Sequence, residues 1–292
     1  MIDQREILWG VLAPPVLMAI GMAATAYLPV TRRFLSTGAL LALVFGVCQL
    51  GFRGWPLPTW SLTANDVHNW PAWIAFATGL ITLCSACGHG PLVWRVLVRL
   101  ALVGFSTVLL LWKQLQHGDV AIAIAWIASV TLVWTALVLA WERAHVATTQ
   151  GVSGIALITL AGASAMGLLL FNTATHAQFA GILTAALTAA LVLGRWRPAW
   201  YQAAGPVTVS ALVLPSLWVL GHWYADLPLW VLPMLALAGL APLIELIGSV
   251  RAWAAWKRVA LVVVVTLLAA SPALVWGIIT SIRASAQPEY GY

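Results

Sequence analysis

Charged side chains are scarce in this sequence: they make up 8% of its 292 residues, whereas a soluble domain carries roughly a quarter. This scarcity excludes a soluble globular protein. Intrinsic disorder requires high charge and low hydrophobicity, so a chain that is 62% hydrophobic is excluded from that class as well. The three cysteines are too few for a disulfide framework. The remaining class is an all-α protein, a polytopic bundle of transmembrane helices.

The motifs of soluble enzymes and of nucleic-acid-binding proteins are also missing. The sequence contains no Gly-rich phosphate loop, no serine-hydrolase elbow and no His-Glu-x-x-His motif. Its basic residues form no clustered stripe of the kind that binds nucleic acid. Little chain is left between the apolar runs, so we expect residues 1–292 to form a single integral-membrane domain without a soluble domain. The lipid bilayer is then the main partner, and the sequence favours a non-enzymatic role.

Apolar runs long enough to cross a bilayer are abundant. A spanning helix needs about 20 mostly apolar residues, because lipid offers no partner to backbone polar groups. Read between charges and turn residues, the sequence predicts about ten spans. They lie at about 7–28, 34–51, 71–90, 96–115, 119–141, 151–171, 177–194, 203–224, 227–249 and 257–282.

The distribution of basic residues predicts the orientation of these spans. Most of the 14 basic residues fall in the connections that follow the odd-numbered spans. The few on the opposite side are Arg5, Arg53, Lys113 and Arg283. Because cytoplasmic connections are enriched in Lys and Arg, both termini are predicted to lie on the outer face. The membrane is expected to be a bacterial inner membrane.

Each of the four predicted outer connections carries one histidine: His68, His117, His176 and His222. Imidazole titrates near neutrality and is the commonest metal ligand, so several histidines at one depth could form a metal site, a haem ligand pair or a proton relay. Alternatively, they are ordinary interfacial residues. No tight spacing such as His-x3-His is present, so only the fold can bring them together. The sequence favours no cofactor, with a metal or haem as the alternative.

The segment Cys84-Ser-Ala-Cys87-Gly-His89 resembles a haem-attachment sequence only superficially. That chemistry requires a histidine directly after the second cysteine, and here Gly88 intervenes. Cys84 and Cys87 could instead form a thiol pair. The structural alternative, small residues that close a helix, is the one we favour.

Glu245 is the only acidic residue inside a predicted span. A charge at the centre of a membrane helix costs roughly 2.5–3.5 kcal/mol, so this side chain is expected to face protein or water. One interpretation is an ion-coupling carboxylate. The other is a structural ion pair with Arg251, Arg95 or Arg99.

The longest outer connection, 52–70, is rich in tryptophan and proline. It contains Trp55, Trp60 and Trp70, and it is too apolar to extend freely into water. We expect it to lie on the membrane surface or against a partner subunit, with a lid over a solute entrance as the alternative.

Two functional classes follow from these features. In the first, the protein is a small secondary transporter or permease for a small solute or ion. Its path would run through the proline-containing spans 203–224, 227–249 and 257–282, with Glu245 as the coupling group. In the second, it is a non-catalytic or cofactor-holding subunit, or an assembly factor, of a larger membrane complex, and the cofactor would be haem, a metal or a quinone.

Overall fold

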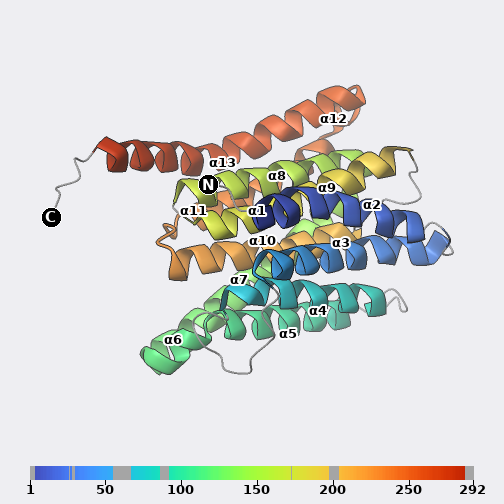
Figure 1. Cartoon of the computed structure of the whole chain (residues 1–292). Coiled ribbons are helices and arrows are strands. Elements are labelled where there is room, and N and C mark those ends of the chain that lie inside the picture. The colour runs from blue at the N-terminus through green and yellow to red at the C-terminus, as the bar shows by residue number, and fades with distance from the viewer. Residues whose placement is uncertain are drawn as a thin grey trace.

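The computed structural model describes residues 4–25, 27, 30–54, 67–85, 92–171, 173–196 and 204–286. Every regular element in these ranges is a helix, as the sequence predicts. The long helices lie side by side along one axis, and the first and last described turns lie at the same end of the bundle (Figure 1).

The first half of the chain runs from α1 to α7. Its elements are α1 (Gln4–Ile7), the π-helical η1 (Leu8–Leu12), α2 (Ala13–Thr25), α3 (Val30–Phe52), the 3-10 turn η2 (Val67–Asn69), α4 (Trp70–Ser85), α5 (Leu92–Leu110), α6 (Trp112–His117) and α7 (Val120–Ala147). The second half comprises α8 (Gln150–Leu170), α9 (Ala174–Trp196), α10 (Ala204–Tyr224), α11 (Val231–Ala238), the 3-10 helix η4 (Ala241–Leu246), α12 (Gly248–Arg251) and α13 (Ala255–Ala286).

Seven helices in the described ranges are long and apolar enough to cross a membrane. They are Gln4–Thr25, Val93–Leu110, Val120–His145, Gly151–Leu170, Ala174–Trp196, Gly205–Tyr224 and Ala255–Arg283. These are the lengths and compositions of a multi-pass integral membrane protein.

The other three predicted spans fall short for separate reasons. In α3 the apolar described part is Thr37–Phe52, α4 has only 16 residues, and the span at 227–249 is divided into α11 and η4. About ten crossings, the orientation of the termini and the bacterial inner membrane therefore remain predictions.

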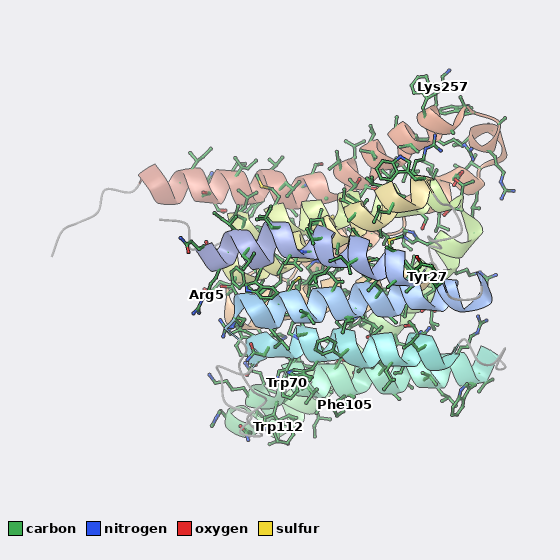
Figure 2. The ribbon with its side chains drawn as sticks, turned by 45° about the vertical axis from the view of Figure 1, so that its right-hand side comes forward. Arg5, Tyr27, Trp70, Phe105, Trp112 and Lys257 are labelled. Carbon is green, nitrogen blue, oxygen red and sulfur yellow. The ribbon has the colours of Figure 1, made fainter. Side chains whose placement is uncertain are left out.

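The burial of side chains follows the pattern expected in lipid. The α10 span is 89% buried inside the bundle, whereas the α7 span is only 22% buried. Large apolar side chains cover the outside, among them Val133 at 70% exposed and Phe105 at 62%, and Phe105 points away from the neighbouring helices (Figure 2). In lipid such exposure carries no hydrophobic penalty.

Two tryptophans of α7 donate hydrogen bonds to backbone carbonyls of the helices beside them. Proline has no N–H, so Pro215 inside α10 leaves the Ala211 carbonyl without its helical donor, and Trp134 Nε1 donates to that carbonyl at 2.9 Å. One α7 heptad later, Trp141 Nε1 donates to the Ala236 carbonyl, near the end of α11, at 3.2 Å.

The break between α11 and η4 occurs at Gly239, and glycine is required there. A Cβ at this position would lie 2.0 Å from the Trp141 indole, well inside contact distance. Pro215 and Pro272 lie inside helices. Pro242 lies at the start of η4, where a missing N–H costs no helical hydrogen bond.

The two ends of the bundle differ in chemistry. The end that holds Arg5, Trp70 and Trp112 also carries most of the described histidines, and we call it the histidine end (Figure 2). The opposite end, with Tyr27 and Lys257, holds the ion pairs Arg99–Glu142 and Glu245–Arg258. We call this the ion-pair end. These ends correspond to the predicted outer and cytoplasmic faces.

Candidate functional site

Two of the four candidate histidines meet at the histidine end. His68, from the 3-10 turn η2, and His176, from the first turn of α9, lie 108 residues apart in sequence. Nδ1 of His68 is 3.1 Å from Nε2 of His176. This is a hydrogen-bond distance, and which ring donates depends on the tautomers. The fold thus brings together two histidines whose contact could not be predicted from their spacing in the sequence.

Neighbouring helices hold the His68 side of this pair. Gln49 of α3 is fully buried, and its Nε2 donates to the His68 carbonyl at 2.8 Å. One turn later, Arg53 Nε lies 3.4 Å from Oδ1 of Asn69. The Tyr224 ring of α10 contacts His68 edge-on, with centroids 6.2 Å apart. η2 is therefore anchored to both α3 and α10.

The pair lines a cavity of about 260 Å³. Its walls are Arg53, His68, Thr173, Ala174, Thr175, His176, Tyr224 and Ala225. No acidic side chain is among these lining residues. His176 is only 3% exposed, and its Nδ1 has no hydrogen-bond partner among the described residues. The first turn of α9 adds backbone N–H groups and the positive end of the helix dipole.

The electrostatics of the cavity are positive. Burial lowers the pKa of His68 below its usual 6.5, and the nearby Arg53 guanidinium lowers the pKa further. His68 is therefore neutral at pH 7. A permanent cation, Arg53, in a lining without an acidic side chain favours a negatively charged guest over a cation.

The distance between the two histidine nitrogens limits the metal or haem sites that the pair could form. Two nitrogen ligands on opposite sides of a metal stand about 4 Å apart, because each metal–nitrogen bond is about 2.0 Å. The 3.1 Å separation of the His68 and His176 nitrogens is too short for that arrangement. Two ligands on the same side of a metal would fit, but the described part of the chain holds no group of three His, Cys, Asp or Glu residues that could hold a metal ion.

The other two candidate histidines are not part of this pair. His222 lies in the last turn of α10, and its Nδ1 donates to the Leu227 carbonyl at 2.6 Å. That bond fixes the turn after α10, in which Asp226 adopts a left-handed conformation (φ 55°). His117 ends α6 and is exposed.

The aromatic and thiol candidates are only partly described. Trp70 begins α4 and packs, half-buried, against the main hydrophobic core. Trp55 and Trp60 lie outside the described residues, so the docking role of their segment stays a prediction. Cys84 falls in the last turn of α4 with its side chain outside the described part, and Cys87 lies outside it altogether.

Glu245 lies in η4 at the ion-pair end and is only 1% exposed. Its carboxylate pairs with Arg258 of α13 and accepts hydrogen bonds from the backbone N–H and the hydroxyl of Thr149, both at 2.9 Å. Thr149 is the N-cap of α8. The expectation of a partner among Arg251, Arg95 and Arg99 is wrong, because the chain turns twice after Glu245 and brings Arg258 to it.

Arg99 instead forms the second ion pair. Its Nε donates to Oε1 of Glu142 at 2.9 Å, and the Thr208 hydroxyl donates to the same oxygen at 2.7 Å. This pair joins α5, α7 and α10.

Sequence analysis missed Arg53, Gln49 and Tyr224 as site residues. Arg53 could have been identified from the sequence, because it is the one basic residue in the same predicted outer connection as His68. Nothing in the sequence around Gln49 and Tyr224 indicates a site, since a polar residue near a helix end does not show which neighbour it faces. No protein-family model matches this sequence, and no curated protein matches it either.

Proposed function

We propose that this protein is a small secondary transporter or permease, and that its solute is a small anion such as a carboxylate or a phosphate. The observation that supports this most strongly is the histidine-end cavity, whose lining combines Arg53 with two histidines and no acidic side chain. Its volume of about 260 Å³ suits a solute of a few heavy atoms.

The cavity offers an anion three kinds of hydrogen-bond donor. Arg53 supplies a guanidinium, which binds carboxylates and phosphates with two parallel hydrogen bonds. The first turn of α9 supplies backbone N–H groups at the positive end of its dipole. His176 supplies Nδ1–H in the tautomer that accepts at Nε2 from His68.

The divided span beyond α10 is the element that we propose to move. The chain is interrupted at Gly239 between α11 and η4, and divided helices of this kind form the substrate and ion sites of many transporters. Glu245 lies in η4, beyond the break, and is the proposed coupling group. Protonation of its carboxylate would remove the charge that holds Arg258 and weaken the bonds from Thr149, so η4 would separate from α8 and α13.

Binding is the first experiment. Purified protein in lipid nanodiscs would be titrated with inorganic phosphate, acetate and succinate, with glycerol as a neutral comparison, and followed by calorimetry. At least one anion should bind saturably. Arg53→Gln should weaken that binding about tenfold or more, because hydrogen bonds to charged groups contribute about 1.5–3 kcal/mol.

Lys113→Gln is the matched control. Lys113 is also a cation of the histidine end, on α6, but it does not line the cavity. The proposal fails if none of these anions binds, or if both substitutions weaken binding equally. Uptake of the bound anion into proteoliposomes would then test transport separately from binding.

A further inference from the structure

A second cavity, of about 610 Å³, lies at the ion-pair end between α8, α9 and α13. It is more than twice as large as the histidine-end cavity and shares no lining residue with it. Val192 of α9 and Trp256 of α13 line it and are 48% and 68% exposed, so the cavity opens on the outer surface of the bundle. In the membrane, a guest would reach it from the surrounding lipid.

The part of the cavity furthest from the helix ends is apolar. Its side chains come from all three helices: Val152, Ile155, Leu191, Val192 and Val259. Ile155 lies about 6 Å further along α8 than Gly151, which lines the cavity near the start of that helix. The apolar part therefore extends into the depth of the acyl chains.

The part nearest the helix ends is polar and cationic. Arg195 and Trp196 lie in the last turn of α9, and both line the cavity. Trp256 lines it from the first turn of α13. The ammonium of Lys257, at the same end of the bundle (Figure 2), lies 5.5 Å from the centre of the Trp256 ring. Lys257 therefore adds a second positive charge beside the cavity.

Negative charge is missing from the cavity walls. No acidic residue is among the described residues that line it. Thr149 is the remaining polar residue of the lining, and its N–H and hydroxyl donate to Glu245. Glu245 itself is paired with Arg258. Arg195 belongs to neither ion pair of the described residues, so its charge is available to a guest.

We propose that this cavity binds a phospholipid with an anionic headgroup, such as phosphatidylglycerol. Its phosphate would accept hydrogen bonds from the Arg195 guanidinium, and an acyl chain would lie against Ile155 and Val192. Tryptophan is enriched at the level of the headgroups, which is where Trp196 and Trp256 would lie. Basic pockets between membrane helices on the cytoplasmic side bind anionic headgroups, and the ion-pair end is the predicted cytoplasmic end.

The two parts of the cavity together favour this lipid over other guests. A free phosphate ion would leave the apolar part unfilled. A purely apolar molecule would leave Arg195 without a partner. A zwitterionic lipid would bring its own cation close to Arg195 and Lys257. An anionic phospholipid matches both the charge and the apolar walls.

The test compares phosphatidylglycerol with phosphatidylcholine, both carrying the same brominated acyl chains, because bromine quenches nearby tryptophans. Protein in detergent micelles would be titrated with each lipid while tryptophan fluorescence is recorded. Phosphatidylglycerol should quench at a several-fold lower lipid fraction than phosphatidylcholine. Inorganic phosphate should displace it no better than chloride at the same ionic strength. Equal quenching by the two lipids, or specific displacement by phosphate, overturns the proposal.

Arg195→Gln then tests the headgroup contact. It should weaken phosphatidylglycerol binding about tenfold or more, because it removes hydrogen bonds between two charged groups. Arg251→Gln is the matched control, since Arg251 of α12 is exposed at the same end but does not line the cavity. Its effect should be several-fold smaller. Equal effects of the two substitutions would mean a diffuse attraction to the protein surface and would overturn the proposal.

Gly151→Leu tests the cavity without changing its charge. A Cβ at Gly151, or at Gly248 of α12, would meet nothing within 4 Å, so both glycines accept a side chain. Only Gly151 lines the cavity. Gly151→Leu should reduce the preference for phosphatidylglycerol, and Gly248→Leu should not; an unchanged preference in Gly151→Leu contradicts the proposal. Anion binding at the histidine end should be unaffected by all four substitutions, so failure of one proposal does not decide the other.

Discussion

Glu245→Gln tests whether this carboxylate is a coupling group or a purely structural one. The substitution keeps the size of the side chain but removes its charge. Glu245 has a side-chain exposure of 2% and Arg258 of 17%, so Arg258 would be left in a poorly solvated position without its partner. Breaking a buried ion pair on one side costs about 3–5 kcal/mol. Because glutamine still accepts one bond from Thr149, we expect the lower end of that range.

The double variant Glu245→Gln with Arg258→Leu separates the two roles. Replacing both members of a buried pair with uncharged residues is often neutral or stabilising, so the double variant should regain most of the lost stability. If Glu245 couples an ion to transport, gradient-driven uptake stays abolished in this stable double variant. If uptake returns along with stability, the coupling role of Glu245 is refuted.

Unfolding in detergent, followed by tryptophan fluorescence, measures the stability of each variant. Glu142→Gln is the comparison: it breaks the Arg99–Glu142 pair of the same end and leaves Arg99, whose side chain is 10% exposed, without its partner. Arg258 is 17% exposed, so the two substitutions should cost similar amounts of stability, because each leaves a poorly solvated guanidinium unpaired. Stability unchanged by Glu245→Gln would contradict the burial argument.

Three further outcomes follow from individual contacts. Because the pKa of His68 is lowered in the folded protein, His68 of the unfolded chain becomes protonated at a higher pH than His68 of the folded protein. The stability that neutral His68 provides is therefore complete above pH 6.5 and falls as the pH drops below it, and unfolding temperatures of His68→Gln should lose that dependence. Gly239→Ala should cost about 1–3 kcal/mol through overpacking against Trp141, as measured by thermal unfolding; an unaffected melting curve would mean that the break relaxes freely. Trp134→Phe should cost about 1–3 kcal/mol, since the Ala211 carbonyl loses the indole donor that replaces the N–H missing at Pro215, and a matched Trp126→Phe should cost less.

The sequence was sufficient for the fold class and for most of the helices. Apolar runs are set by the thickness of the bilayer, so seven of the predicted spans correspond to helices long enough to cross it. The span at 227–249 was predicted as one helix because, apart from Glu245, its residues are almost all apolar. The break at Gly239 depends on contact with Trp141, almost a hundred residues earlier in the chain, and no local pattern contains that information.

The sequence predicted which membrane surface the candidate histidines lie near. It did not predict which of them are neighbours in the bundle. Topology placed four histidines near one membrane surface, yet only His68 and His176 meet. Which helix neighbours which is decided by side-chain packing over the whole bundle. The partner of Glu245 was missed for a related reason: a continuous helix would have kept Arg258 more than three turns away, whereas the turns at Ile247 and after Arg251 bring it back.

The central position of α10 has a consequence for how the protein reaches the membrane. Among the long helices its span has the lowest hydropathy, 1.3, and is also the most enclosed. It contains Pro215, and the Ala211 carbonyl that this proline leaves without a helical donor accepts from Trp134 of α7. Such a segment partitions poorly into lipid by itself. α7 precedes α10 in the chain, so helices that insert in the order of synthesis would bring the indole donor into the bilayer before the segment whose carbonyl it bonds.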